Sequence, residues 1–254
     1  MQAVLILAGA LATGVVSLAF GQALLSLLRL PLKGLERATL AFLTGSVLLS
    51  IAVFLLAAAG LARREAYLAL GILAIVAARG RPFSFGRTED AGLGRAWRIA
   101  AALAFAVFTC IYLLHAMAPE HSPDGSSYHL GLVSFYNDAG GLVKTTDNMY
   151  ALFPQGIEML FLYAFSIGRH SAASLVEFSF LAALAILLYA SGRRMGDPVA
   201  GLFASFAVYA SPIVGWTGTC AYIDVAVAAL VFGMFHLLYR WEEGLPGNAL
   251  APAG

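Results

Sequence analysis

Long apolar runs recur along this chain, and they constrain its fold more than any motif does. A helix needs about 20 residues to cross a ~30 Å hydrocarbon core, and most of the runs approach that length. Since 61% of the residues are hydrophobic and only 11% are charged, a soluble core is excluded. The sequence predicts an all-α polytopic membrane protein with about seven transmembrane helices, at 3–28, 38–61, 66–78, 99–117, 172–190, 199–214 and 222–239.

Basic residues between the runs predict how the helices are oriented. The connector 29–37, the polar loop 79–98, the pair Arg193 and Arg194, and Arg240 all fall on one side of the alternating spans. The positive-inside rule makes that side cytoplasmic, and only Arg63 and Arg64 disagree. We expect two parts, residues 1–98 with the N-terminal helices and the basic cytoplasmic loop, and a core of residues 99–254.

Residues 118–158 form the main polar segment, which this topology places as a large loop on the outer face. The segment collects acids and histidines that are scarce elsewhere in the chain. It leads into 156–168, which is apolar but only 13 residues long and carries Glu158 near its start. A run of that length is short for a span, so we interpret it as an interfacial or re-entrant helix.

Asp124 is the candidate catalytic residue in the outer segment. It stands in the turn Pro123-Asp124-Gly125, which exposes a carboxylate next to the membrane surface. There it could act as a general base towards a hydroxyl arriving from water. The alternative is that Asp124 only caps a turn or a short helix. The other acids of the segment, Glu120, Asp138 and Asp147, are expected to be solvated or supporting.

Four short motifs, in order along the chain, resemble the polytopic GT-C glycosyltransferases, in particular a bacterial subgroup of mannosyltransferase-like and arabinose-transferase-like enzymes. They cover roughly residues 99–241, and the first ~95 residues carry none. They are D-x-x-x-Y-H-L at Asp124, Tyr128, His129 and Leu130; the segment with Asn148, Tyr150 and 153–160; Gly192-Arg193-Arg194; and Ala221-Tyr222-Ile223-Asp224.

The resemblance implies an enzyme that moves a sugar from a polyprenyl-phosphate donor to a hydroxyl of a lipid, glycan or protein acceptor. Asp124 would be the general base of an inverting displacement. Cations such as Lys144, Arg169, His170 or His129 would offset charge on the departing phosphate. It further implies a bacterial inner (plasma) membrane location, a periplasmic or extracellular active face, and a longer enzyme of which this chain is the N-terminal fragment.

The other expected substrate-binding residues each have a plainer alternative. Asp224 and Glu158 could be ordinary acids in the first turn of a helix, stabilised by its dipole. Tyr128 and Tyr150 could be aromatic residues of the membrane interface, and Lys144 a solvated loop residue. No cofactor or metal site is predicted. The histidines near Asp124 fit no zinc template, although the use of a divalent cation stays open.

Two rival functions remain beside the glycosyltransferase. In a transporter or channel subunit, Asp224, Glu177 and His236 would line a polar path. A non-catalytic scaffold would not need Asp124. The acids gather at one face instead of recurring through the depth of the bilayer, which disfavours transport. The net charge of +1, with basic residues scattered among loops, excludes a nucleic-acid-binding surface.

Overall fold

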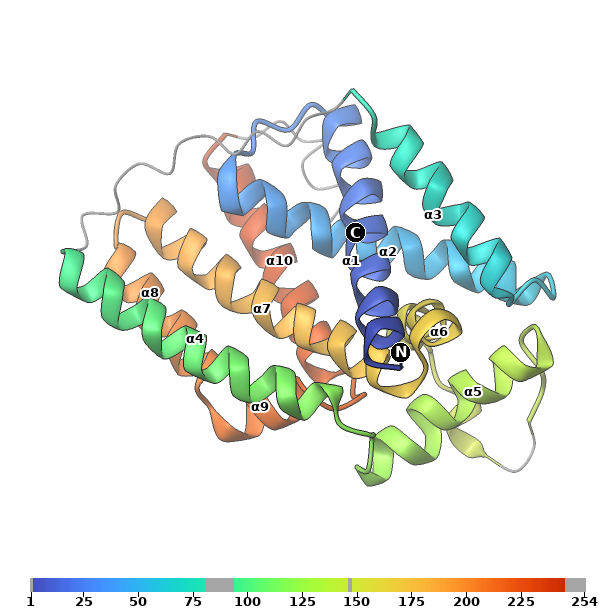
Figure 1. Cartoon of the computed structure of the whole chain (residues 1–254). Coiled ribbons are helices and arrows are strands. Elements are labelled where there is room, and N and C mark those ends of the chain that lie inside the picture. The colour runs from blue at the N-terminus through green and yellow to red at the C-terminus, as the bar shows by residue number, and fades with distance from the viewer. Residues whose placement is uncertain (1, 81–93, 146–147, 245–254) are drawn as a thin grey trace.

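The computed structural model describes residues 2–80, 94–145 and 148–244, all of whose regular elements are helical. Asp147 and residues 81–93 of the predicted cytoplasmic loop lie outside this description. The elements are α1 (Gln2–Leu27), α2 (Gly34–Ala58), α3 (Arg64–Ala78), α4 (Arg95–Met117), η1 (Gly125–His129), α5 (Leu130–Ala139), η2 (Met149–Leu152), α6 (Gly156–Gly168), α7 (His170–Arg194), α8 (Pro198–Tyr209), α9 (Pro212–Thr217) and α10 (Asp224–Glu242) (Figure 1).

Within the described part of the chain, five helices are long and apolar enough to cross a membrane: α1, α2, α4, α7 and α10. The chain is therefore an integral membrane protein. The two other predicted spans fall on shorter helices. Run 66–78 lies in α3, which has 15 residues, and run 199–214 is divided between α8 and α9. Pro212 lacks a backbone N–H and disfavours helical geometry in Ser211, so it separates those two helices.

Small residues let α1 and α2 pack with their backbones almost in contact. A Cβ atom added to Gly21 would overlap the carbonyl of Ala41, and one added to Gly45 would overlap the carbonyl of Ser17. The spacing of Ser17 and Gly21 on α1, and of Ala41 and Gly45 on α2, repeats a small residue every fourth position, a pattern that permits close helix approach in membranes. This pair forms the N-terminal wall of the bundle.

Helix α6 occupies the centre of the fold. It packs against α1, α2, α3, α5 and α7, and 11 of its 13 residues are buried. Its neighbours therefore enclose α6 on all sides, and the interfacial and re-entrant interpretations of 156–168 both stay predictions. A helix that is apolar all round is stable only when neighbours enclose it, which explains why its sequence shows no polar face.

The end of the bundle that holds the polar segment is defined by contacts between helix ends. Ser171 Oγ, at the start of α7, donates a hydrogen bond to the Ala118 carbonyl after α4 at 2.9 Å. The Ala226 N–H, at the start of α10, donates to Glu177 Oε1 of α7 at 2.9 Å. The C-terminus of α4 and the N-termini of α7 and α10 therefore meet, as the alternating topology predicts.

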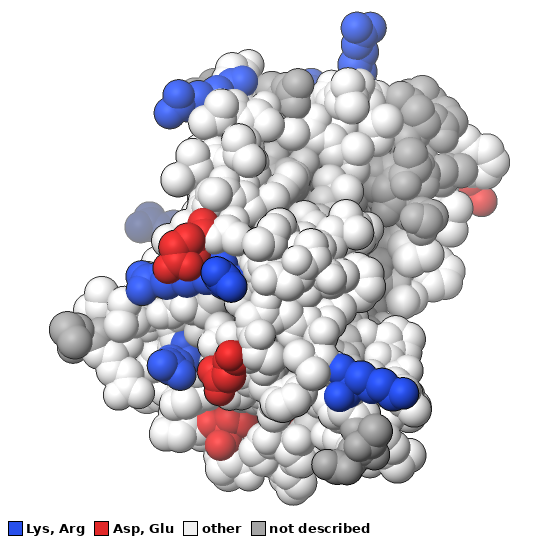
Figure 2. Space-filling view, turned by 90° about the vertical axis from the view of Figure 1, so that its right-hand side faces the viewer, with Lys and Arg blue, Asp and Glu red and all other residues white. Residues whose placement is uncertain are grey.

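Basic residues gather at the opposite end. Arg194 at the end of α7 bonds Glu243 after α10 at 2.8 Å. Arg240 of α10 lies 2.7 Å from Glu36 at the start of α2. The connector 29–37, the pair Arg193 and Arg194, and Arg240, which the sequence assigns to one side of the membrane, thus lie together at one end of the bundle. On the face drawn in Figure 2, charged side chains stand in small groups separated by uncharged areas, and acidic and basic groups lie side by side near mid-height.

Candidate functional site

A cavity of about 240 Å³ opens where the polar segment meets the N-terminus of α10. Six of the seven predicted site residues line it, and only Lys144 does not. The lining residues are Asp124, Tyr128, His129, Leu132, Tyr150, Phe153, Pro154, Gln155, Glu158, Tyr222, Ile223 and Asp224. We call this space the acidic cavity. Its walls come from η1, η2, α6 and α10, which are distant in sequence.

Asp124 stands immediately before the π-helical turn η1, and its side chain is exposed to solvent. The turn packs closely against the preceding loop, because a Cβ atom on Gly125 would meet the side chains of Ser122 and Glu120. Ser126 Oγ also donates to the Ser122 carbonyl at 2.7 Å. A one-turn π-helix inside helical structure is often found at functional sites, and here it sets Asp124 and Tyr128 on the rim of the cavity.

Two tyrosines form an aromatic wall of the acidic cavity. The rings of Tyr128 and Tyr150 stack with centroids 4.0 Å apart and planes inclined by 12°. Asn148 holds the second ring in place, because its Oδ1 accepts from the Tyr150 N–H at 3.0 Å. Burial raises the pKa of Tyr128, and Asp124, Tyr150, Tyr222 and Asp224 raise it further by disfavouring a second negative charge.

Glu158 forms the floor of the acidic cavity with His129. The Glu158 side chain is 6% exposed, and its Oε1 lies 2.8 Å from His129 Nδ1. Its other oxygen, Oε2, is buried and has no hydrogen-bond partner among the described residues. A buried carboxylate oxygen without a donor is costly, so the position of Glu158 carries an energetic penalty.

Asp224 lines the cavity from the first turn of α10, where the helix dipole favours a carboxylate. Glu177 lies beneath it and is fully buried in α7. Since Glu177 accepts from the Ala226 N–H, it caps the start of α10 and positions that turn. Sequence reasoning considered Glu177 only for a transport path. An acid inside an apolar run signals that Glu177 has a role, but it does not identify the backbone N–H that Glu177 bonds.

Glu120 has a supporting role that goes beyond a solvated loop acid. It accepts from the backbone N–H groups of His121 and Ser122 at 3.0 and 2.8 Å, and from that of Ala221 near α10. Burial would raise the pKa of this carboxyl, but the hydrogen bonds from Ser122, Ala221 and His121 outweigh it and hold the pKa below its ordinary value. Glu120 thereby ties the loop before Asp124 to the loop before Asp224.

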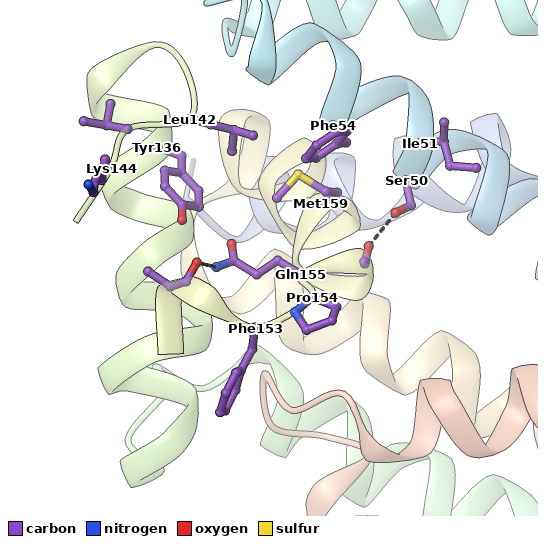
Figure 3. Close-up of a pocket in the computed structure, with 13 residues that line it drawn as sticks. Ser50, Ile51, Phe54, Tyr136, Leu142, Lys144, Phe153, Pro154, Gln155 and Met159 are labelled. Atoms are coloured by element: carbon purple, nitrogen blue, oxygen red, sulfur yellow. Dashed lines mark hydrogen bonds between the residues drawn. The ribbon is translucent and has the colours of Figure 1, made fainter. Parts of the chain in front are cut away.

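A second, larger cavity of about 510 Å³ adjoins the acidic cavity and includes Lys144. The two share Phe153, Pro154 and Gln155 as a common wall. Apolar and aromatic side chains supply most of the remaining lining, and they come from α2, α5, the segment 142–143, η2 and α6, including Phe54 and Met159 (Figure 3). The Gly156 carbonyl accepts from Ser50 Oγ at 2.6 Å. We call this space the apolar cavity.

The remaining candidates lie apart from these two cavities. Asp138 is exposed on α5, and Arg169 and His170 stand at the junction of α6 and α7. His115 bonds Thr219 at 2.8 Å, and His236 is packed at the other end of the bundle. Within residues 2–80, 94–145 and 148–244, no three His, Cys, Asp or Glu side chains are placed to hold a metal ion.

Comparison with known proteins yields no match: no family model fits the chain, and no curated protein or solved structure is significantly similar to it.

Proposed function

We propose that this chain is the part of a membrane glycosyltransferase that contains the general base, and that Asp124 is that base. The observation that carries the proposal is the acidic cavity. It collects an exposed carboxylate, two further carboxylates and a stacked tyrosine pair at one end of a membrane bundle. Carboxylates and aromatic faces are the groups that orient a polyhydroxylated ring, and a positioned carboxylate can remove a proton from one of its hydroxyls.

The reaction is a single displacement. Asp124 takes the proton of the acceptor hydroxyl as that oxygen attacks the anomeric carbon of the donor sugar. The bond between the anomeric carbon and the phosphate oxygen breaks, and the lipid phosphate leaves with the electron pair. The new glycosidic bond has inverted configuration. Holding both substrates at the rim of one cavity supplies the proximity that this displacement needs.

The apolar cavity is suited to the donor. Its lining is mainly hydrophobic, which fits the first isoprene units of a polyprenyl chain, and Lys144 can pair with the phosphate. The acidic cavity shares the wall of Phe153, Pro154 and Gln155 with it, so a sugar attached to that phosphate would reach Asp124 around this wall. Separating the phosphate from the carboxylates also avoids repulsion between them.

The proposed membrane arrangement is that of the GT-C enzymes, in a bacterial plasma membrane. The ends with Arg194 and Arg240 face the cytoplasm and the acidic cavity faces outward. Helix α3, and α8 together with α9, complete the seven spans by local thinning of the bilayer, which short helices can cause at modest cost. The segment 118–158 then forms the outer loop, and α6 re-enters from the outer side.

The test is sugar transfer by the full-length protein reconstituted in lipid vesicles with a labelled polyprenyl-phosphate sugar. Asp124→Asn keeps the shape of the side chain and removes the base, so transfer is expected to fall by about 100-fold or more. Asp138→Asn is the matched control, because Asp138 is an exposed acid on α5 outside both cavities. It should transfer sugar at the wild-type rate.

Unchanged transfer by the Asp124→Asn variant would exclude Asp124 as the base. A transporter or scaffold would show no transfer in either variant. In the transporter case, vesicles would instead accumulate or release a solute in a manner that depends on the protein.

A further inference from the structure

We propose that a groove between α4, α7 and α8 holds one acyl chain of an anionic phospholipid, and that Arg98 binds the phosphate of this lipid. The lipid belongs to the leaflet at the basic end of the bundle. The site lies apart from the acidic cavity and the apolar cavity, so the inference does not rest on the proposed function.

The groove is a cavity of about 420 Å³ between three helices that lie side by side (Figure 1). Small-molecule sites commonly have volumes of about 300–1,000 Å³. Apolar and aromatic side chains dominate the lining, and the described residues of the lining include no acid. They are Leu35, Arg98, Ala101, Phe105, Thr109, Ala182, Ala185, Ile186, Tyr189, Leu202, Ser205 and Tyr209. We call this space the α4 groove.

The α4 groove runs from a membrane surface towards the middle of the bilayer. Arg98 lies in the first turns of α4 at the basic end of the bundle, and Thr109 follows 11 residues later on the same helix. At ~1.5 Å per residue, these two residues are about 16 Å apart along the helix axis, roughly half of a ~30 Å hydrocarbon core. The groove therefore has the depth of one leaflet, which is the depth that one acyl chain occupies.

The deep end of the α4 groove suits hydrocarbon, because the hydroxyl groups there bond to protein atoms. Thr109 Oγ1 lies 2.8 Å from Tyr209 Oη, and the Tyr112 hydroxyl donates to the Tyr209 carbonyl at 2.6 Å. The ring of Phe105 packs against that of Tyr209, with centroids 5.2 Å apart. A chain end that contacts these rings leaves the hydroxyl groups paired, so its burial costs no hydrogen bond.

Two arginines stand at the surface end of the α4 groove. Arg98 lines it and is exposed. The Arg193 guanidinium lies over the ring of Tyr189, another lining residue, with its carbon 5.7 Å from the ring centroid. Basic pockets between transmembrane helices bind the phosphates of anionic lipids. A guanidinium has five N–H donors, so it can bond a phosphate in addition to the contacts it makes within the chain.

Charge complementarity selects the occupant. An apolar groove one leaflet deep, with cations at its surface end, matches an amphiphile that has an anionic head group and a hydrocarbon chain. A soluble phosphate ester lacks the chain, and a neutral lipid lacks the net charge. An apolar helix from a second copy of the chain would give the two guanidinium groups no anion to bind.

Native mass spectrometry of the full chain tests the inference. The chain is released from a mild detergent that contains equal amounts of phosphatidylglycerol and phosphatidylcholine with the same acyl chains. One bound phosphatidylglycerol is expected, preferred about tenfold over phosphatidylcholine, because each arginine near a lipid head group contributes about threefold to fivefold. Arg98→Gln and Arg193→Gln should each lower this preference about threefold. Arg29→Gln is the matched control, since Arg29 is an exposed arginine between α1 and α2 and does not line the groove.

A second variant tests the seat of the acyl chain without changing the charge. Ala182→Phe places a ring in the α4 groove and keeps both arginines, so it should remove the bound lipid. Thermal unfolding shows whether this variant folds. Added phosphatidylglycerol should raise the unfolding midpoint of the wild type and of Arg29→Gln, and leave that of Ala182→Phe unchanged. Glycerol phosphate, which has the charge but no acyl chain, should not displace the lipid.

Several results would overturn the inference. They are equal retention of the two lipids by the wild type, an equal loss of preference in Arg98→Gln and Arg29→Gln, and unchanged retention by a folded Ala182→Phe variant. Displacement of the lipid by glycerol phosphate would reduce the site to one for a soluble anion. A lipid-free dimer that Ala182→Phe prevents would assign the groove to a second copy of the chain.

Discussion

His236 Nε2 of α10 lies 2.9 Å from Glu36 Oε1 of α2, although 200 residues separate them in the sequence. The same carboxylate oxygen is 2.7 Å from Arg240 Nε, and His236 Nδ1 is 2.8 Å from Ser191 Oγ. This network joins α2, α7 and α10 at the end of the bundle opposite the acidic cavity. Glu36 is the carboxylate that both His236 and Arg240 approach.

Glu36→Ala is expected to destabilise the protein. The change leaves buried His236 Nε2 without its partner and removes the carboxylate beside Arg240, which keeps its bond to Glu243. Removal of one partner from a fully buried pair costs about 3–5 kcal/mol. Because the Glu36 side chain is 15% exposed, we expect about 2 kcal/mol. Thermal unfolding in detergent measures it. Glu65→Ala is the control, since Glu65 is also a first-turn acid but is exposed on α3. Equal effects of the two substitutions would contradict this account.

Gly45→Ala should weaken the contact between α1 and α2. The added methyl group would overlap the Ser17 carbonyl, so the helices must separate, at a cost of about 1–3 kcal/mol. Gly14→Ala is the matched change, because Gly14 is also in a helix and a Cβ atom there meets nothing within 4 Å. It should be neutral or raise stability by up to about 1 kcal/mol through helix propensity. Denaturation midpoints in detergent distinguish them, and similar midpoints would exclude close packing.

Glu120 should make the free energy of unfolding decrease at acidic pH. Its pKa is lowered in the folded state, so the unfolded carboxyl takes up a proton first. The stabilisation is therefore complete above the unfolded pKa of about 4.3 and is lost as pH falls through the lower folded value. Glu120→Gln should cost about 1 kcal/mol at neutral pH and flatten the acid dependence. Unfolding scans between about pH 6 and pH 3 check both effects, and parallel curves for the two proteins would refute the assignment.

Lys144→Gln should weaken donor binding if the proposed function holds. The side chain is exposed, so its attraction to a phosphate is screened, and we expect the donor KM to rise about fivefold with little change in kcat. Lys33→Gln is the control, since Lys33 is an exposed lysine that precedes α2 at the opposite end of the bundle. A fall in kcat at unchanged KM would instead place Lys144 in the chemical step.

Much of the helical framework could be predicted from the sequence. An apolar run as long as the bilayer is thick has few stable conformations other than a transmembrane helix. The start of α8 is a clear case. An Asp followed by a Pro is a pattern that favours a capped helix start, and Asp197 Oδ1 accepts from the Ala200 N–H at 2.9 Å. The break at Pro212 could have been anticipated from the same rules, but the apolar residues on both sides concealed it.

The sequence predicted most residues that line the acidic cavity, but it did not predict the residues that hold them in position. Asp124, Tyr128 and Asp224 stood out as polar or aromatic groups beside apolar runs, and they line one cavity. The roles of Glu120 and Glu177 could not be predicted, because each depends on a backbone N–H more than 45 residues away. The enclosure of α6 was also hidden, since an apolar sequence reads the same against lipid as against protein.

The central position of α6 has a consequence for how the protein is made. A helix of 13 residues is too short to be held in a bilayer by its own hydrophobicity. During synthesis it follows α1, α2, α3 and α5, so these partners are already available when it emerges. Its remaining contact, with α7, comes next in the chain. The burial of α6 therefore depends on helices that are made before it, and the order of synthesis is part of what allows this chain to fold.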